Sequence, residues 1–222
     1  KKIITSIVVH QSELADAVLL LEQAILARPL TDDLKYREHA AHFYKRCMQF
    51  SGPLMAKGVE DTLMYTYNRF IGHNDVGDAP EAFGITAEQF HLAMIERQQH
   101  WPLSLNATST HDTKRGEDVR ARLNVLSDLH EEWISAAKHW QELNSEHKAA
   151  GAPDANDEYL IYQTLVGAYP LAEDEEEGFL PRMEQFLEKA LREAKTHSNW
   201  TKPNEAYEGA AKQFVRSILA TH

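Results

Sequence analysis

The sequence has 222 residues, of which 43% are hydrophobic and 26% are charged, so it is long enough to bury a core and has an ordinary globular composition. No apolar run approaches the roughly 18 residues of a membrane-spanning helix, which argues against a membrane partner. The 23 Lys and Arg residues stand against 34 Asp and Glu residues, and the resulting net charge of −11 would repel the phosphates of nucleic acid.

The only cysteine and the start of the chain indicate the cellular setting. Cys47 cannot form an internal disulfide, and no basic and apolar signal segment opens the sequence. We therefore expect a cytoplasmic protein. The sequence opens with KKIITS and has no initiating Met, from which we expect that an upstream part was removed.

Helical spacing of apolar residues dominates the first part of the chain. It predicts amphipathic helices over residues 12–28 and 34–50. A third helix is expected to begin at about Pro53, because the first turn of a helix tolerates proline. The turn-rich segment 71–84 is expected to be a long loop, and loops of this length in compact domains are often functional.

Thr86 and Gln89 have the spacing of a capping box, which predicts the start of a helix over residues 87–100. Residues 103–109 (LSLNATS) alternate apolar and polar side chains, as in a short strand. A buried strand without a partner would leave its backbone groups unpaired, so we expect its neighbouring strands to lie outside this chain. Further helices are expected over residues 119–127, 128–147, 157–169, 177–195 and 204–220.

The predicted fold is therefore mostly α-helical, with one short strand. We expect three parts: a helical segment over residues 1–100, a strand-like segment with a polar loop over 101–118, and a second helical segment over 119–222. These parts are expected to form one compact piece.

The polar stretch THDTKRGED, residues 110–118, follows the predicted strand and has two interpretations. In the first, Asp112 or Thr113 caps the next helix, whose first turn would hold Glu117 and Asp118. In the second, a charged cluster at the carboxyl end of an apolar strand is catalytic, since barrel enzymes keep their catalytic residues there.

The motif GPLMAKGVEDT, residues 52–62, also has two interpretations. Lys57, Glu60 and Asp61 share one helical face, and the simpler hypothesis is a solvated ion pair on an amphipathic helix. The alternative is a charged and aromatic wall, with Tyr65 and Tyr67, that hydrogen-bonds and stacks on a sugar.

The closest histidine pair, His39 and His42, is a possible metal site. The metalloprotease pattern has a His-x-x-x-His spacing with an internal Glu, whereas here Glu38 precedes a His-x-x-His spacing. Both the ligand spacing and the position of the base are wrong. We therefore expect that no metal ion binds there and that the melting temperature does not depend on zinc.

Five motifs together resemble the maltooligosyl trehalose synthases, a family in the α-amylase clan of glycoside hydrolases. The match runs from about Arg46 to the end of the chain. The family usually has NEVG where residues 74–77 read NDVG, so Asp75 is one methylene shorter than its usual counterpart. In chain order the motifs are GPLMAKGVEDT (52–62), YNRF (67–70), LNATSTHDTKRGEDVRARL (105–123), DEYLIYQTLVGAYP (157–170) and WTKPNEAYE (200–208).

The resemblance implies a (β/α)8-barrel enzyme, of which this chain is the helical insertion region around strand seven with its catalytic loop. Such enzymes convert the reducing-end α-1,4 bond of a maltooligosaccharide into an α,α-1,1 bond by retaining intramolecular transfer. The clan's His–Asp pair falls on His111 and Asp112. Asp112 would stabilise the oxocarbenium-like transition state, and His111 would hydrogen-bond the same sugar. Lys114, Arg115 and Lys57 would bind the reducing-end glucose.

The resemblance also implies what the chain lacks. In the family, the carboxylate nucleophile and the general acid lie on earlier barrel strands, and we find neither motif in this sequence. We therefore expect an inactive fragment, whose partners are the remainder of the barrel and a maltooligosaccharide. No metal ion or organic cofactor is expected. The alternative is a helical interaction module that kept the sequence without the chemistry.

Overall fold

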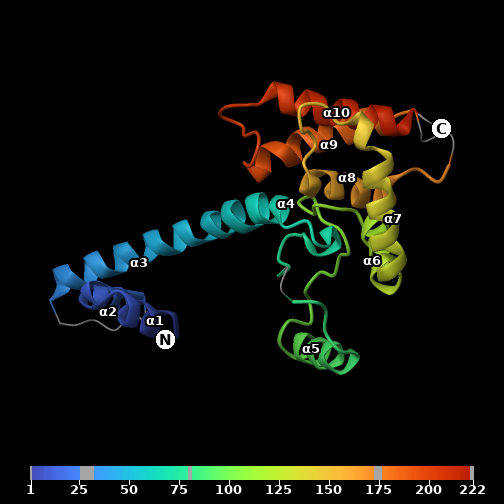
Figure 1. Cartoon of the computed structure of the whole chain (residues 1–222). Coiled ribbons are helices and arrows are strands. Elements are labelled where there is room, and N and C mark those ends of the chain that lie inside the picture. Colours follow the sequence, from blue (N-terminus) through green and yellow to red (C-terminus); the bar gives the residue numbers. More distant parts are fainter. Residues whose placement is uncertain (1, 26–32, 80–81, 173–176, 221–222) are drawn as a thin grey trace. The chain divides into compact units, whose positions relative to one another are not determined.

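The computed structural model describes residues 2–25, 33–79, 82–172 and 177–220. The chain separates into two compact units, Lys1–Lys57 and Gly58–His222. Within the described residues, no helix is both long and apolar enough to cross a membrane. The predicted mostly helical fold is confirmed, and the helices are labelled in Figure 1.

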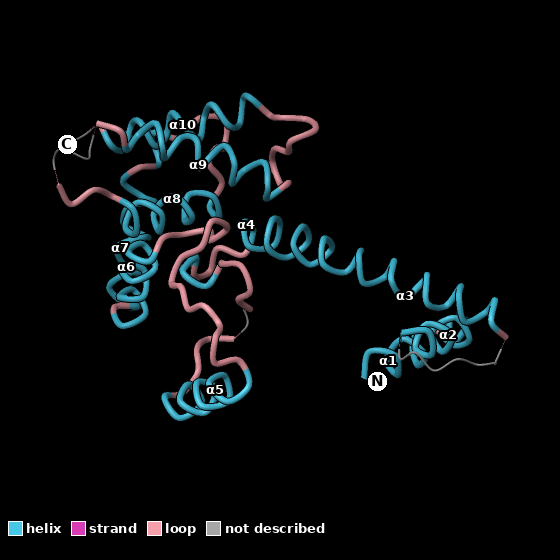
Figure 2. The backbone as a smooth tube through the Cα atoms, turned by 180° about the vertical axis from the view of Figure 1, so that it is seen from behind, coloured by secondary structure: helices cyan, strands magenta, loops and turns pink. Residues whose placement is uncertain are grey.

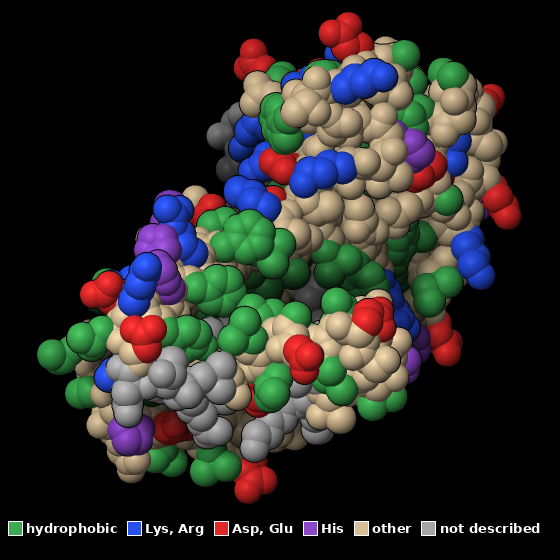
Figure 3. All heavy atoms as spheres, turned by 90° about the vertical axis from the view of Figure 1, so that its left-hand side faces the viewer, with side chains coloured by type: hydrophobic (Ala, Val, Ile, Leu, Met, Phe, Trp, Pro, Cys, Tyr) green, Lys and Arg blue, Asp and Glu red, His purple; other side chains and the backbone are tan. Residues whose placement is uncertain are grey.

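The described residues of unit 1 form four helical elements ahead of η2 (Ala56–Leu63). These are α1 (Lys2–His10), the 3-10 turn η1 (Ser12–Leu14), α2 (Ala15–Ile25) and α3 (Leu34–Met55). Helix α2 contacts both α1 and α3. Asp33 caps α3 by accepting a hydrogen bond from the backbone N–H of Lys35 at 3.0 Å. Hydrophobic side chains lie between charged and histidine side chains on the face shown in Figure 3.

The prediction that a helix begins at Pro53 is wrong. Pro53 lies inside the last turn of α3, and the helical path continues into the π-helical segment η2 (Ala56–Leu63). A proline inside a helix removes one backbone hydrogen bond, and π-type turns, which are rare, mostly occur as local bulges inside α-helices. The sequence alone did not distinguish a proline at the start of a helix from one near its end.

Unit 2 contains the remaining helices. They are α4 (Met64–Thr66), η3 (Ile71–His73), α5 (Ala87–His100), α6 (Glu117–Asp128), α7 (His130–Leu143), η4 (Ser145–His147), α8 (Ala155–Ala168), α9 (Phe179–Ala194) and α10 (Glu205–Leu219). Long loops precede and follow α5, as the tube in Figure 2 shows. The helices predicted after residue 118 are confirmed, with small shifts at their ends.

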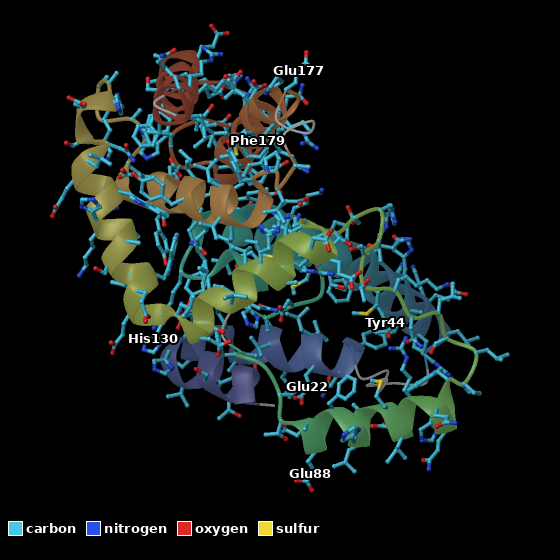
Figure 4. All side chains as sticks on the ribbon, turned by 90° about the vertical axis from the view of Figure 1, so that its right-hand side faces the viewer. Glu22, Tyr44, Glu88, His130, Glu177 and Phe179 are labelled. Atoms are coloured by element: carbon cyan, nitrogen blue, oxygen red, sulfur yellow. The ribbon has the colours of Figure 1, made fainter. Side chains whose placement is uncertain are left out.

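Helix α5 has the capping box expected from the sequence. The Thr86 hydroxyl accepts from the backbone N–H of Gln89 at 3.2 Å, and the Gln89 side chain accepts from the backbone N–H of Thr86 at 2.9 Å. None of its described residues is buried, and Glu88 in its first turn points to solvent (Figure 4).

Among the described residues of unit 2, two hydrophobic clusters form the core. The larger one joins α7, α8, α9 and α10. Phe179, which is labelled at the start of α9 in Figure 4, packs its ring against that of Tyr169, with the ring centroids 5.2 Å apart. The second cluster joins α4, α6, α8 and α9 and contains Tyr65, Ile71, Leu123, Leu160, Ala190 and Ala194. The second cluster therefore supports α6, the helix that follows the polar loop.

The strand expected over residues 103–109 does not form. These residues lie in a loop between α5 and α6, and Leu103 and Leu105 are 95% and 94% exposed. The physical reason is that a strand needs a partner for its backbone hydrogen bonds. Among the described residues the only β-type pairing is the bridge between Ala149 and Ala152.

Candidate active-site loop

The polar loop before α6 is organised by two threonines. The hydroxyl of Thr113 accepts from the backbone N–H of Thr110 at 2.6 Å, and the two hydroxyl oxygens lie 3.1 Å apart. The backbone N–H of Asp112 donates to the Thr110 hydroxyl at 3.3 Å. This turn presents the Asp112 side chain on its outer surface, where it is exposed together with that of His111.

The helix-cap interpretation of this loop is wrong for Asp112 and Thr113. Gly116 is the residue that caps α6, and its position carries no side-chain cap hydrogen bond. Glu117 and Asp118 do lie in the first turn, where the helix dipole favours negative charge. The carboxylate of Asp112 is thus not used to begin the helix, and within the described residues no side chain hydrogen-bonds to it.

Lys114 is held by its side chain. Its Nζ lies 2.7 Å from Oδ1 of Asp61 and 5.3 Å from the centroid of the Tyr65 ring. Burial lowers the pKa of Lys114, but the hydrogen bond to Asp61 and the nearby Tyr65, Asp61 and Asp112 outweigh burial, so the pKa is raised above its ordinary value. Lys114 therefore stays protonated at neutral pH.

Lys114 is also held by its backbone. Oδ1 of Asp75 accepts from the backbone N–H of Lys114 at 3.1 Å and from that of Val76 at 2.7 Å. Oδ2 of the same carboxylate lies 3.4 Å from Nη1 of Arg120, whose Nη2 donates to the backbone carbonyl of Thr108. The buried Asp75 thus joins the loop at 74–77 to the middle of the polar loop and, through Arg120 of α6, to Thr108 just before that loop.

The side chain of Arg115 points into the protein. It is buried, and its Nη1 donates to the backbone carbonyl of Asn74 at 3.1 Å. Burial lowers its pKa to about 10, although Tyr65 and Asp75 oppose that shift. Within the described part of the chain, Nη2 of Arg115 is buried and has no hydrogen-bond partner.

Lys57 is the last residue of unit 1, whereas the other predicted site residues belong to unit 2. Its side chain is exposed in the first turn of η2. The structure therefore exposes His111 and Asp112, holds the Lys114 ammonium against Asp61 and buries the Arg115 side chain. It describes Lys57 only within its own unit.

Sequence reasoning missed the residues that hold the loop. Asp75, Asn74 and Arg120 had no assigned role. Asp61 was placed with Lys57 and Glu60 on one helical face, and its contact with Lys114, 53 residues away, was not predicted. The available signal was the polar motif at 74–77 inside a loop long enough to suggest function. The side chains of its first two residues, Asn74 and Asp75, are buried, which is unusual for loop Asn and Asp and indicates a specific contact.

A second cluster of possible metal ligands lies at the start of α8. Asp154, Asp157 and His197 place one ligand atom each within 4.8 Å of the others. The Asp154 carboxylate already caps α8 and lies 2.7 Å from Nε2 of His197, and Asp157 accepts from the Tyr207 hydroxyl at 2.6 Å. These protein contacts explain the cluster without an ion. Among the described residues, His39 and His42 belong to no group of three ligands.

A pocket in unit 2 lies elsewhere than the polar loop. It has a volume of about 700 Å³ and lies between α7, η4, α8 and α10. Trp140, Tyr162 and Tyr169 line it together with aliphatic side chains, and no residue of the polar loop does. The loop is instead a surface with an exposed carboxylate, an exposed imidazole and an ammonium fixed by a carboxylate, which are groups that can hydrogen-bond hydroxyls and stabilise positive charge.

The chain is similar to known enzymes over most of its length. It is 39% identical over 174 residues to a protein of Mycobacterium tuberculosis that carries the name maltooligosyl trehalose synthase; the match covers 78% of this chain and 22% of that protein. The solved maltooligosyltrehalose synthase of Arthrobacter ramosus matches with 30% identity and a TM-score of 0.76, over 97% of this chain and 25% of that one. A solved glycosyltrehalose synthase matches with 36% identity and a TM-score of 0.68, over 85% and 26% of the two chains.

The chain thus spans about a fifth of the length of the curated relatives that it matches. No protein-family model matches it.

Proposed function

The chain is homologous to the maltooligosyl trehalose synthases over the segment that it covers, and from this we propose that the full-length protein carrying it is such an enzyme. The proposed reaction converts the reducing-end α-1,4 bond of a maltooligosaccharide into an α,α-1,1 bond by retaining intramolecular transfer. The observation that carries the proposal is the homology together with an exposed His111–Asp112 pair on a loop that is fixed from both sides.

Asp112 is the catalytic carboxylate of this segment. The sugar ring gains positive charge as its glycosidic bond breaks, and a preorganised carboxylate beside it lowers the energy of that transition state. The exposed Asp112 side chain caps no helix and has no hydrogen bond to another described side chain, which leaves both oxygens for sugar hydroxyls and the developing charge. His111 hydrogen-bonds the same sugar.

Lys114, Arg115 and Lys57 bind the reducing-end glucose. After the bond breaks, this glucose must turn and attack the covalent intermediate before water does, so its positioning and the exclusion of water decide between isomerisation and hydrolysis. Lys114 supports this role because its ammonium is charged and fixed. Arg115 keeps one buried guanidinium nitrogen without a described protein partner.

The nucleophile and the general acid lie in the remainder of the barrel, which is the proposed protein partner of this chain. The exposure of Leu103 and Leu105 supports this arrangement, because alternate apolar side chains of a barrel strand are buried when neighbouring strands pair with it. Helix α5 carries further exposed apolar side chains, among them Phe90, Leu92 and Ile95. The isolated chain is therefore inactive.

Incubation with maltopentaose tests the proposal. The full-length protein is expected to yield a non-reducing product with a trehalose end, detected by loss of reducing ends and by mass conservation. The isolated chain is expected to yield none. Turnover by the isolated chain would refute its assignment as an incomplete part of the enzyme, and an inactive full-length protein would favour the helical interaction module.

A further inference from the structure

Two acidic side chains hold Lys114 from opposite ends. Asp61 binds the ammonium at 2.7 Å, and Asp75 accepts the backbone N–H at 3.1 Å. These residues come from separate segments, the end of η2 and the loop after η3. Together they fix both the start and the end of a side chain that would otherwise rotate about four bonds.

The ion pair between Lys114 and Asp61 is well shielded. The two side chains are 9% and 21% exposed, so the contact is screened less by water than a surface pair would be. An ammonium has three N–H donors. Asp61 accepts a hydrogen bond from one of them, and the Tyr65 ring lies beside the ammonium. The geometry therefore aims the remaining N–H donors in set directions.

The backbone contact is part of a wider set. Asp75 also accepts from Arg120, which donates to the carbonyl of Thr108. Thr108 lies just before the loop and Lys114 lies in its middle, on either side of Asp112, so Asp75 sets the distance across the turn that carries Asp112. Its carboxylate is largely buried, which is costly unless each oxygen has donors, as here.

We propose that Asp61 and Asp75 are positioning residues, which fix Lys114 and thereby set the ratio of isomerisation to hydrolysis. The proposal rests on the proposed function. Neither residue touches the reacting atoms. Their effect is on where the released glucose is held, so loss of either should let water compete, whereas cleavage of the α-1,4 bond should continue.

The ratio of products tests this in the full-length protein. Asp61→Asn keeps the shape of the side chain and removes its charge, and Asp75→Ala removes the acceptor. For each, we expect the ratio of released glucose to trehalose-ended product to rise about tenfold, with a smaller change in total bond cleavage. Asp75→Glu is expected to restore the ratio towards that of the wild type, because a longer carboxylate can still reach the same donors. A merely structural loss would lower both products together.

Asp78→Asn is the matched control. Asp78 lies in the same loop as Asp75, but its carboxylate contacts His73 at 3.1 Å and its own neighbour Ala79 at 2.8 Å. Its product ratio should match that of the wild type. An unchanged ratio in both Asp61→Asn and Asp75→Ala, with folded proteins, would overturn the proposal.

Amide hydrogen exchange in the isolated chain separates this proposal from the proposed function. Asp75→Ala should speed exchange of the Lys114 amide about tenfold or more, and Asp78→Asn should not. Exchange unchanged by Asp75→Ala would overturn the positioning role of Asp75, even in an active enzyme. A full-length wild-type protein that makes no trehalose-ended product would instead refute the proposed function, while faster exchange would still show that Asp75 holds the loop.

Discussion

Arg192 of α9 and Glu208 of α10 form a two-pronged ion pair. Nε and Nη2 of the arginine each lie 2.8 Å from a different carboxylate oxygen of the glutamate. The Arg192 guanidinium also lies 5.1 Å from the centre of the Trp200 ring. Since Trp200 and Glu208 begin and end the motif WTKPNEAYE, this motif fastens the last two helices to each other.

The ion pair predicts a pH-dependent stability. The hydrogen bonds from Arg192 hold the pKa of Glu208 below its ordinary value of 4.5, although burial opposes the shift. A lowered folded-state pKa means that the ionised carboxylate adds stability above the unfolded-state pKa, and that this stability is lost as the pH falls through the folded-state pKa.

Glu208→Gln tests this by thermal melts from pH 7 down to pH 3. The variant should melt roughly 5 °C below the wild type at pH 7, because it loses a charged hydrogen-bond acceptor. The difference in melting temperature between the variant and the wild type should shrink below about pH 4.5, because Glu208 of the wild type then becomes protonated. A difference that stayed constant across this range would show that the ionised state of Glu208 does not stabilise the fold.

The same motif shows what sequence reasoning can and cannot supply. The helix at residues 204–220 was predictable because apolar spacing is local, and the structure has it at Glu205–Leu219. The partner of Glu208 was not predictable, since Arg192 lies in another helix and no local spacing links them. WTKPNEAYE contributed to the family resemblance, yet its described contacts hold the fold together.

A buried glutamine of α8 is predicted to hold the segment between α4 and η3. Gln163 of α8 accepts from the backbone N–H of Ile71 at 2.9 Å and donates to the carbonyl of Asn68 at 2.7 Å. Gln163→Leu would leave both backbone groups buried without partners. We expect a loss of about 2–4 kcal/mol in the free energy of unfolding, measured by urea denaturation.

Gln213→Leu is the matched control, because Gln213 is exposed on α10. It should change the free energy of unfolding by no more than about 0.5 kcal/mol. Equal effects of the two substitutions would contradict the assigned role of Gln163.

Two helical glycines should respond in opposite directions to alanine. A Cβ at Gly167 of α8 would lie 2.9 Å from Cγ1 of Val119 and 3.2 Å from Cγ of Leu123, both on α6. Gly167→Ala should therefore cost about 1–3 kcal/mol despite its better helix propensity. Gly209 of α10 has open space around it, so Gly209→Ala should stabilise by up to about 1 kcal/mol. Chemical denaturation of both variants measures this, and stabilisation by Gly167→Ala would show that α6 and α8 are not in close contact.

The segments around the polar loop show the same difference between contacts of residues that are near in sequence, which were predictable, and contacts of residues that are far apart, which were not. The capping box of α5 was predicted from the three-residue spacing between Thr86 and Gln89, and it is confirmed. The contact between Asp61 and Lys114 was not predicted, because spacing on one helix gives no sign of a residue 53 positions later. The strand at 103–109 failed for a related reason: an alternating pattern forms a strand only when another strand pairs with it.

The most direct test of the proposed function is the activity of the full-length protein with Asp112→Asn. The substitution removes the negative charge beside the proposed transition state and keeps the size of the side chain, so turnover of maltopentaose should fall by about 10³-fold. Asp112 is exposed and caps no helix, so the free energy of unfolding should change by no more than about 0.5 kcal/mol. The control Asp118→Asn, in the first turn of α6, should retain activity. Wild-type turnover by a folded Asp112→Asn enzyme would contradict the account.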